Sequence, residues 1–285
     1  MNRIFVVDGN WYLHRCFFTL KTSRPIGDVL PLNFLGLVCK DACAVRATHV
    51  LVCFDGPQVF RYKLYPEYKA NRREKDVGDS EDEGGKDLYQ YLPQVRKLLA
   101  DCGIAFRQSA KHEADDCLTS AGIKWGDDHI VIFGTADKDT YQGLRKNVSA
   151  YNSTAKPTPI MVTAAKAEKK KGVPISGMVM FQTLTGDPTD NVPELLSPGK
   201  AKAAVNKWGT FKQWYTKGTK EDRRWLTVNQ VALQLNRKLV ELVTDISLPD
   251  LDELRPQKKQ IEDMPRAWYE LQAFLYPKSK GLFKR

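Results

Sequence analysis

Short apolar runs alternate with amphipathic stretches along the first half of the chain. The apolar runs are rich in β-branched and aromatic residues, which predicts buried strands. These predicted strands cover residues 3–7, 49–54, 104–107 and 129–133. Helical spacing predicts helices over residues 32–47, 87–99 and 112–124, with a turn at Gly9 and Asn10. Strands that alternate with helices favour an α/β fold with a mostly parallel sheet flanked by helices.

The pattern changes after Tyr151. Residues 152–159 are polar and contain two prolines, and residues 166–172 are rich in lysine. From Ser176 onward the spacing is mainly helical, with breaks at glycine and proline. We therefore expect a domain boundary near residue 175, which divides the chain into an α/β part, 1–175, and a helical part, 176–285.

Composition narrows the class of protein. The net charge of +10 favours a polyanionic partner. The six cysteines form no CxxC pair and the four histidines form no HxH or HExxH pattern, so we expect free thiols and no zinc site. The chain lacks an apolar run of about 18 residues and a signal-peptide pattern, so we expect no membrane contact and a cytoplasmic location.

Carboxylates are concentrated in short clusters, and three clusters follow predicted strands. Asp8, Asp55 and Asp137 each stand at the carboxyl end of a strand, where the active crevice of a parallel sheet lies. Two carboxylates about 4 Å apart repel by about 4 kcal/mol at an effective dielectric near 20. Converging carboxylates therefore need cations, and oxygen ligands suit Mg²⁺. The full candidate set is Asp8, Asp55, Glu113, Asp115, Asp116, Asp137, Asp139, Asp187 and Asp190.

Each cluster taken alone also has an ordinary structural interpretation. The acids at 113–116 fit the first turn of a helix, whose dipole favours negative charge. Asp187 before Pro188 fits a helix N-cap with proline at the first helical position. Asp137 and Asp139 fit a turn. Their joint occurrence is what favours a metal site.

Basic residues interleave with tyrosines over residues 61–75. This stretch fits a clamp in which cations neutralise phosphates and tyrosine rings stack on unpaired bases, or simply a solvated amphipathic helix. The acidic residues 76–85 that follow indicate a loop. Further along, Gly199, Lys200 and Lys202 open a predicted helix whose N–H groups could hold a phosphate.

Six short motifs stand in a fixed order. They are Val6-Val-Asp-Gly-Asn10, Phe54-Asp-Gly56, Tyr68-Lys-Ala-Asn-Arg72, Glu113-Ala-Asp-Asp116, Thr135-Ala-Asp-Lys-Asp139 and Thr185-Gly-Asp-Pro-Thr-Asp-Asn191. Together they resemble the motifs of the structure-specific 5′ nucleases, a family that includes phage flap endonucleases and the 5′-nuclease domain of bacterial DNA polymerase I. The resemblance runs from residue 3 to about residue 210.

The resemblance implies a PIN-like nuclease domain, an arch near residues 60–90 and a helix–three-turn–helix region. It implies hydrolysis of DNA phosphodiesters at 5′ flaps, nicks and 5′ ends during replication, with two or more Mg²⁺ or Mn²⁺ ions. One ion cluster would involve Asp8, Asp55, Glu113, Asp115 and Asp116, and the other Asp137, Asp139, Asp187 and Asp190. Asp116 and Asp139 are the carboxylates we take as catalytic.

The same resemblance assigns roles around the clamp. Lys69 and Arg72 would contact the scissile phosphate and Tyr68 would stack on the substrate. We expect further DNA contacts from Arg61, Gly199, Lys200 and Lys202. The family's glycine-rich hairpin is reduced here to Gly199, which leaves a monovalent-ion site without support.

Partners and alternatives follow from this assignment. The expected partners are DNA with 5′ single-strand/duplex junctions and, in the alternative, RNA–DNA hybrids, with the chain acting as a monomer. One alternative function is a 5′ nuclease that removes RNA primers, and another is a DNA-junction binder that does not cut. The basic tail at 277–285 would touch DNA or a replication partner, or is simply solvated.

Overall fold

A six-stranded sheet organises the first half of the molecule in the computed structural model, which describes residues 1–20, 26–70, 88–259 and 261–277. The strands are β1 (Arg3–Asp8), β2 (His49–Phe54), β3 (Ala105–Gln108), β4 (Ile130–Gly134), β5 (Val148–Asn152) and β6 (Ile160–Val162). Their order in the sheet is β3-β2-β1-β4-β5-β6. All neighbouring pairs are parallel except β5 and β6. The predicted mostly parallel α/β sheet is therefore confirmed.

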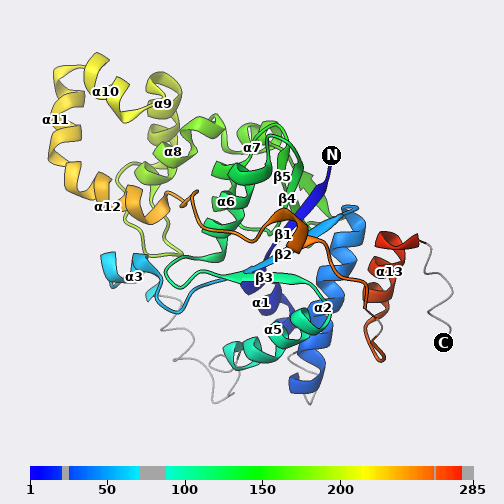
Figure 1. Ribbon diagram of the computed structural model, residues 1–285. Helices are drawn as coiled ribbons and strands as arrows, with labels where there is room; N and C mark the ends of the chain where they lie inside the picture. The colour runs from blue at the N-terminus through cyan, green and yellow to red at the C-terminus, as the bar shows by residue number, and fades with distance from the viewer. Residues whose placement is uncertain (21–25, 71–87, 260, 278–285) are drawn as a thin grey trace.

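Helices separate and follow the strands (Figure 1). They are α1 (Gly9–Leu20), α2 (Ile26–Ala44), α3 (Phe60–Leu64), α5 (Leu92–Asp101), α6 (Ala114–Trp125), α7 (Ala164–Lys171), α8 (Met178–Thr185), α9 (Pro198–Trp208), α10 (Phe211–Lys217), α11 (Lys220–Val228), α12 (Gln230–Val240) and α13 (Arg266–Leu275). Short 3-10 helices are η1 (Leu88–Tyr91), η2 (Asp139–Gly143), η3 (Ile175–Gly177) and η4 (Leu251–Leu254).

Each face of the sheet packs against its own set of helices. Successive side chains of a strand point to opposite faces, and β1 shows this directly. Ile4 and Val6 pack in the layer that contains α6, α8 and α9. Phe5 and Val7 pack in the layer that contains α1, α2, α5 and α13. Figure 1 shows these two layers on either side of the strands.

Helices α8 to α12 form a helical part at one end of the molecule (Figure 1). The chain then returns to the sheet, because α13 packs against α2 and buries Trp268 and Leu271 in the same layer as Phe5. The end of the chain therefore contributes to the core of the α/β part.

Several predicted elements differ from the observed ones. Gly9 and Asn10 form no separate turn, because α1 begins at Gly9 directly after β1. Strands β5 and β6 were not predicted. The predicted helix start at Asp187 is wrong: Asp187 and Val192 pair with each other across a tight turn. The six cysteines are all free, as expected.

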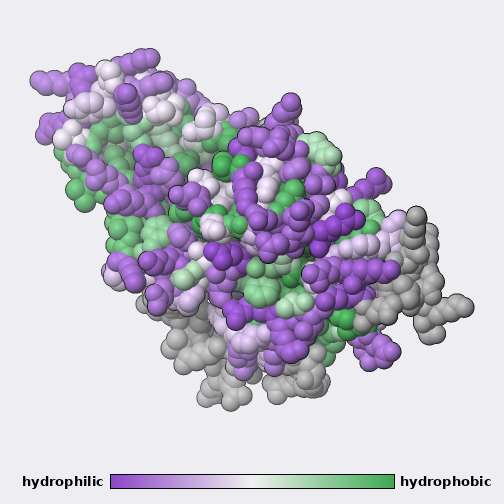
Figure 2. All heavy atoms as spheres, viewed as in Figure 1, coloured by the Kyte–Doolittle hydropathy of each residue, from purple (hydrophilic) through white to green (hydrophobic). Residues whose placement is uncertain are grey.

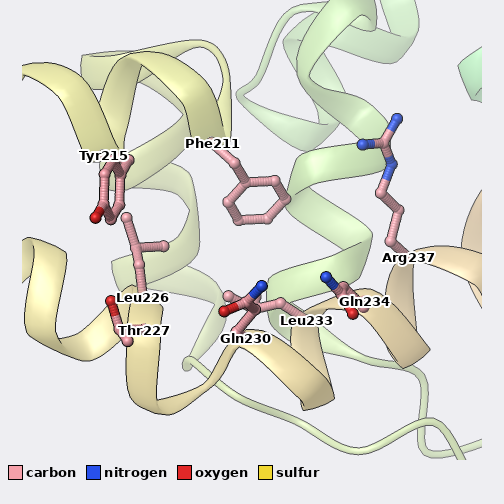
Figure 3. A pocket seen from close by; sticks show the side chains of 8 residues that line it. All are labelled: Phe211, Tyr215, Leu226, Thr227, Gln230, Leu233, Gln234 and Arg237. Carbon is pink, nitrogen blue, oxygen red and sulfur yellow. The ribbon is translucent and has the colours of Figure 1, made fainter.

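An apolar hollow of about 480 Å³ lies between α10, α11 and α12. Its lining includes Phe211, Tyr215, Leu226 and Leu233, with Arg237 at one side (Figure 3). In Figure 2 apolar side chains show between polar ones over these helices. None of the predicted site residues that the structure describes lines this hollow. Within the described parts of the chain, no helix has the length and apolar character to cross a bilayer.

Candidate active site

Three adjacent strands bring three predicted carboxylates to one edge of the sheet. Asp8 ends β1, Asp55 follows β2 and Asp137 lies shortly after β4, and β1 is hydrogen-bonded to both other strands. The hydroxyl of Thr135 donates to Asp8 Oδ2 at 3.2 Å, which links the ends of β4 and β1. The shared rim expected from the sequence is therefore present.

The start of α6 supplies further carboxylates to this edge. The amide of Ala114 donates to Asp55 Oδ1 at 2.7 Å and so fixes the helix start against the end of β2. Glu113 and Asp116 form a reciprocal capping arrangement, as expected of acids at a helix start. Between them, Asp115 has a buried carboxylate oxygen, Oδ1, with no hydrogen-bond partner among the described residues. An unpartnered buried carboxylate oxygen is suited to a cation.

A tight turn after α8 supplies the last two carboxylates. Oxygens of Asp139, Asp187 and Asp190 all lie within 4.8 Å of one another. Gly186 makes the turn possible: its φ is +61°, and a Cβ there would lie 2.4 Å from two backbone oxygens. Gln182 on α8 donates to Asp139 Oδ1 at 2.6 Å. These three carboxylates are close enough to share one cation.

One small pocket collects most of the predicted residues. Six of the nine carboxylates line it, together with Arg61, Tyr68 and Lys69. Those six are Glu113, Asp115, Asp137, Asp139, Asp187 and Asp190. Asp8 and Asp55 are outside the lining, but Asp8 repels Asp115 and Asp55 repels Glu113. Asp116 is also outside the lining and is completely buried.

Burial and mutual repulsion shift the acid–base equilibria of this edge. Burial, followed by the charges of Asp55 and Asp137, raises the pKa of Asp8 to about 7. Burial and neighbouring carboxylates likewise raise the pKa of Asp139 to about 7 and that of Asp55 to about 6. The same causes hold the pKa of Asp115 well above its usual value. The site therefore has more negative charge than its own cations neutralise.

Lys69 is placed in the pocket by two loops that hold each other. Its backbone has a φ of 55°, in the left-handed region, and its amide donates to the carbonyl of Asp190 at 2.9 Å. In return, Asn191 donates to the carbonyl of Glu67 at 3.0 Å. Lys69 Nζ pairs with Glu113 and lies 3.8 Å from Asp190 Oδ2. Burial lowers the pKa of Lys69, but these carboxylates outweigh it, so the pKa stays well above its usual value.

Two other residues of the predicted clamp are buried and do not present a surface to DNA. Arg61 is completely buried, and Tyr68 is only 4% exposed, so its ring offers no open face to a base. The single hydroxyl hydrogen of Tyr68 is instead shared between Glu113 Oε2, at 3.2 Å, and Asp190 Oδ2, at 3.3 Å. Arg72 lies outside the described residues, as do the acidic residues 76–85 and most of the predicted arch.

The residues predicted to hold a phosphate in the helical part lie apart from the pocket. Gly199, Lys200 and Lys202 stand in the first turns of α9, and all three are exposed. Gly199 has no atom within 4 Å of the place where a Cβ would stand. The backbone there is accessible from solvent.

Sequence reasoning missed three polar side chains beside the carboxylates. Thr135 and Gln182 donate to Asp8 and Asp139, as described above. Lys171, at the end of α7, lies near Asp139, and burial lowers its pKa although that carboxylate acts in the opposite direction. The lysine-rich run at 166–172 was the one signal that could have pointed to Lys171. Gln182 has no such signal, because it lies within an apolar helix.

The raised carboxylate pKa values predict how stability depends on pH. A carboxyl group whose folded pKa exceeds its unfolded pKa binds its proton more tightly in the folded state, so its contribution to stability falls as pH rises between the two values. For Asp8 this window runs from 3.8 to about 7. Asp8→Asn should therefore become progressively more stable than the parent chain across this window in EDTA. Urea unfolding at several pH values checks this, and a stability difference that stays constant would contradict it.

Carboxylates gathered at the carboxyl ends of parallel strands, with a half-buried lysine among them, define a metal-dependent hydrolase of phosphate esters. The chain belongs to the 5′-3′ exonuclease family, because the family model for the 5′-3′ exonuclease N-terminal resolvase-like domain matches residues 3–172. It is accordingly a 5′–3′ exonuclease, an enzyme that hydrolyses phosphodiester bonds.

Relatives match over most of the chain. The 5′-3′ exonuclease of Aquifex aeolicus is 26% identical, and the match covers 92% of this chain and 93% of that protein. The thermostable DNA polymerase I of Thermus thermophilus is 28% identical over 91% of this chain, which spans only 32% of the polymerase.

Solved structures share the fold. The bacteriophage T5 5′-exonuclease with bound zinc superimposes with a TM-score of 0.70 at 21% identity, covering 84% of this chain and 89% of that one. The T5 flap endonuclease in a pseudo-enzyme-product complex with DNA and metal ions gives the same TM-score, identity and coverage.

Proposed function

We propose that this chain uses Mg²⁺ or Mn²⁺ to hydrolyse DNA phosphodiesters at 5′ flaps, nicks and 5′ ends. The observation that carries this is the single pocket lined by six carboxylates, three of which have oxygens within 4.8 Å of one another. Membership of the 5′-3′ exonuclease family supports the reaction. The T5 relative with DNA and metal ions supports the substrate and the cofactor.

The donor set fits hard divalent cations. Asp139, Asp187 and Asp190 would hold one ion, and Asp115, with its unpartnered oxygen, would hold another with Asp8, Asp137 and Glu113 nearby. Such ions lower the pKa of a bound water and stabilise attacking and leaving oxygens. We propose that Lys69, whose ammonium group pairs with Glu113 in the pocket, stabilises negative charge on the scissile phosphate.

We assign Asp116 a different task from the metal ligands. Both of its oxygens are occupied: Oδ2 accepts from Arg61 and from the amide of Glu113, and Oδ1 accepts from Arg61 and from the amide of Val243. A carboxylate with four donors on two oxygens has little capacity left for an ion. Asp116 would therefore hold the start of α6 in place.

The helical part would hold the duplex backbone. The exposed N-terminal turn of α9, with Gly199, Lys200 and Lys202, is suited to phosphate contacts that are independent of sequence. We propose that this part begins near residue 175, just after the end of the family match at residue 172. It would comprise α8 to α12, since α13 packs with the α/β part.

The test is a cleavage assay on a 5′-labelled flap duplex with Mg²⁺, with Mn²⁺ and with EDTA. We expect products near the junction with either ion and none in EDTA. A matched duplex with an RNA 5′ strand is the second arm. Faster hydrolysis of the RNA strand would identify RNA, in place of DNA, as the main substrate. Binding of the duplex without a metal-dependent product would overturn the proposal.

A further inference from the structure

Arg61 is a completely buried cation whose five N–H groups are all used. Nε donates to the carbonyl of Leu239 at 2.8 Å, and Nη2 donates to the carbonyl of Glu241 at 3.0 Å. The two terminal nitrogens grip Asp116 in a fork at 2.7 and 2.8 Å. Nη1 also donates to Glu113 Oε2 at 2.9 Å. A guanidinium satisfied in this way has no donor left for a phosphate.

These hydrogen bonds hold the carboxylate of Glu113 in place through one of its two oxygens, Oε2. Glu113 Oε2 is held by Arg61 and Tyr68, while Oε1 pairs with Lys69 at the pocket wall. Without Arg61, Glu113 and Asp116 would be two buried carboxylates next to each other, which is strongly unfavourable. Arg61 therefore compensates Asp116 and sets the orientation in which Glu113 lines the pocket.

The same guanidinium connects the helical part to the site. Leu239 and Glu241 lie at the end of α12, and α12 contacts α3, the helix that carries Arg61. Figure 1 shows α3 and α12 on the same side of the sheet. The segment is held a second time by Gln142, which donates to the carbonyl of Val240 at 3.0 Å and accepts from the amide of Leu242 at 2.9 Å.

We propose that Arg61 is a positioning residue that fixes the orientation of Glu113 in the wall of the pocket that would hold the metal ions, and that it fastens the end of α12 to this pocket without touching DNA. This rests on the proposed metal-dependent function. It replaces the DNA contact expected from the basic character of residues 61–75. The connection between the end of α12 and the pocket is therefore made by the side chain of Arg61, which the sequence pattern had placed on the surface.

Two substitutions of Arg61 distinguish the positioning role from a purely structural role and from a DNA contact. Arg61→Met removes the charge and all five donors, and Arg61→Lys keeps the charge but cannot reproduce the fork. Arg266→Met, which removes an exposed arginine of α13 paired with Glu270, is the matched control. Three quantities are measured on each full-length chain: the Mg²⁺ concentration for half-maximal flap cleavage, the rise in melting temperature on adding Mg²⁺, and DNA affinity in EDTA at several salt concentrations.

We expect the Mg²⁺ requirement to rise about 10- to 100-fold in Arg61→Met and less in Arg61→Lys, as for residues that orient metal ligands. The thermal stabilisation by Mg²⁺ should shrink, whereas affinity for DNA in EDTA and its salt dependence should match Arg266→Met. A purely structural role would lower the melting temperature equally with and without Mg²⁺. A DNA contact would reduce the salt dependence of binding, by about one unit of slope. Either outcome overturns the proposal.

Arg61→Lys keeps the test decisive if Arg61→Met fails to fold, because an unchanged Mg²⁺ requirement in Arg61→Lys also overturns the proposal. Glu113→Gln separates this inference from the function on which it rests. If Glu113→Gln cleaves at the parental rate, the metal site itself is wrongly assigned. If Glu113→Gln is impaired while both Arg61 variants behave like the parent chain, the inference about Arg61 alone fails.

Discussion

Asp139→Asn is expected to slow cleavage of a 5′-flap duplex by about 10²–10³-fold, the loss typical of removing one strong electrostatic stabiliser from an active site. Asp139 belongs to the group of three carboxylates whose oxygens lie within 4.8 Å. An amide provides one neutral oxygen in place of a charged carboxylate, so the attraction for a divalent ion falls. Single-turnover rates at saturating DNA measure the effect directly.

Two further readouts make this prediction specific. Burial and repulsion raise the pKa of Asp139 to about 7, so the neutral side chain should make the chain more stable in EDTA near neutral pH, and Mg²⁺ should stabilise it less. Asp128→Asn, at an exposed position between α6 and β4, is the matched control and should change neither quantity. A parental cleavage rate in Asp139→Asn would count decisively against the site.

Lys69→Met is expected to lower the cleavage rate at saturating DNA by about 10²-fold, since a preorganised cation near the reacting phosphate acts mainly on the transition state. In the described part of the pocket, Lys69 is the cation with part of its side chain exposed, whereas Arg61 has none. Methionine removes the ammonium group and keeps an unbranched side chain that is one heavy atom shorter. It also preserves the left-handed backbone strain at this position, which glycine would relieve.

The controls for this prediction address charge and position. Lys69→Arg keeps a cation in the pocket and should retain more activity than Lys69→Met. Lys97→Met removes an exposed lysine on α5 and should leave the rate unchanged. If Lys69→Met weakened DNA binding in EDTA but left the saturated rate intact, Lys69 would be a binding residue and not a catalytic one.

The placement of Asp8, Asp55 and Asp137 could be predicted because it depends on local pattern. Runs of β-branched residues form buried parallel strands, and parallel strands end at one edge of a sheet. Strands β5 and β6 were missed, since β5 is a short run with polar residues and β6 has only three residues. Short elements of this kind are formed by pairing with a neighbour, which local pattern does not reveal.

Residues of the same chemical type took different roles in three dimensions. Lys69 and Arg61 are both cations of one basic stretch and both line the pocket, yet Lys69 keeps part of its side chain exposed while Arg61 is buried against the end of α12. Asp115 and Asp116 are neighbours, yet one has an unpartnered oxygen and the other is fully occupied. On a helix, adjacent side chains point about 100° apart. The role of each carboxylate is therefore decided by the groups that pack on its own side of the helix.

Strand patterning and ordered motifs are local properties, so the fold class, the family and the carboxylates available for a metal site could all be inferred from the sequence. Which side chains meet depends on the folded chain. The turn at 186–192 brings Asp187 and Asp190 to Asp139, and the end of α12 buries Arg61. Charge compensation acts between residues far apart in the chain, so its outcome depends on which buried groups the fold places within hydrogen-bonding distance.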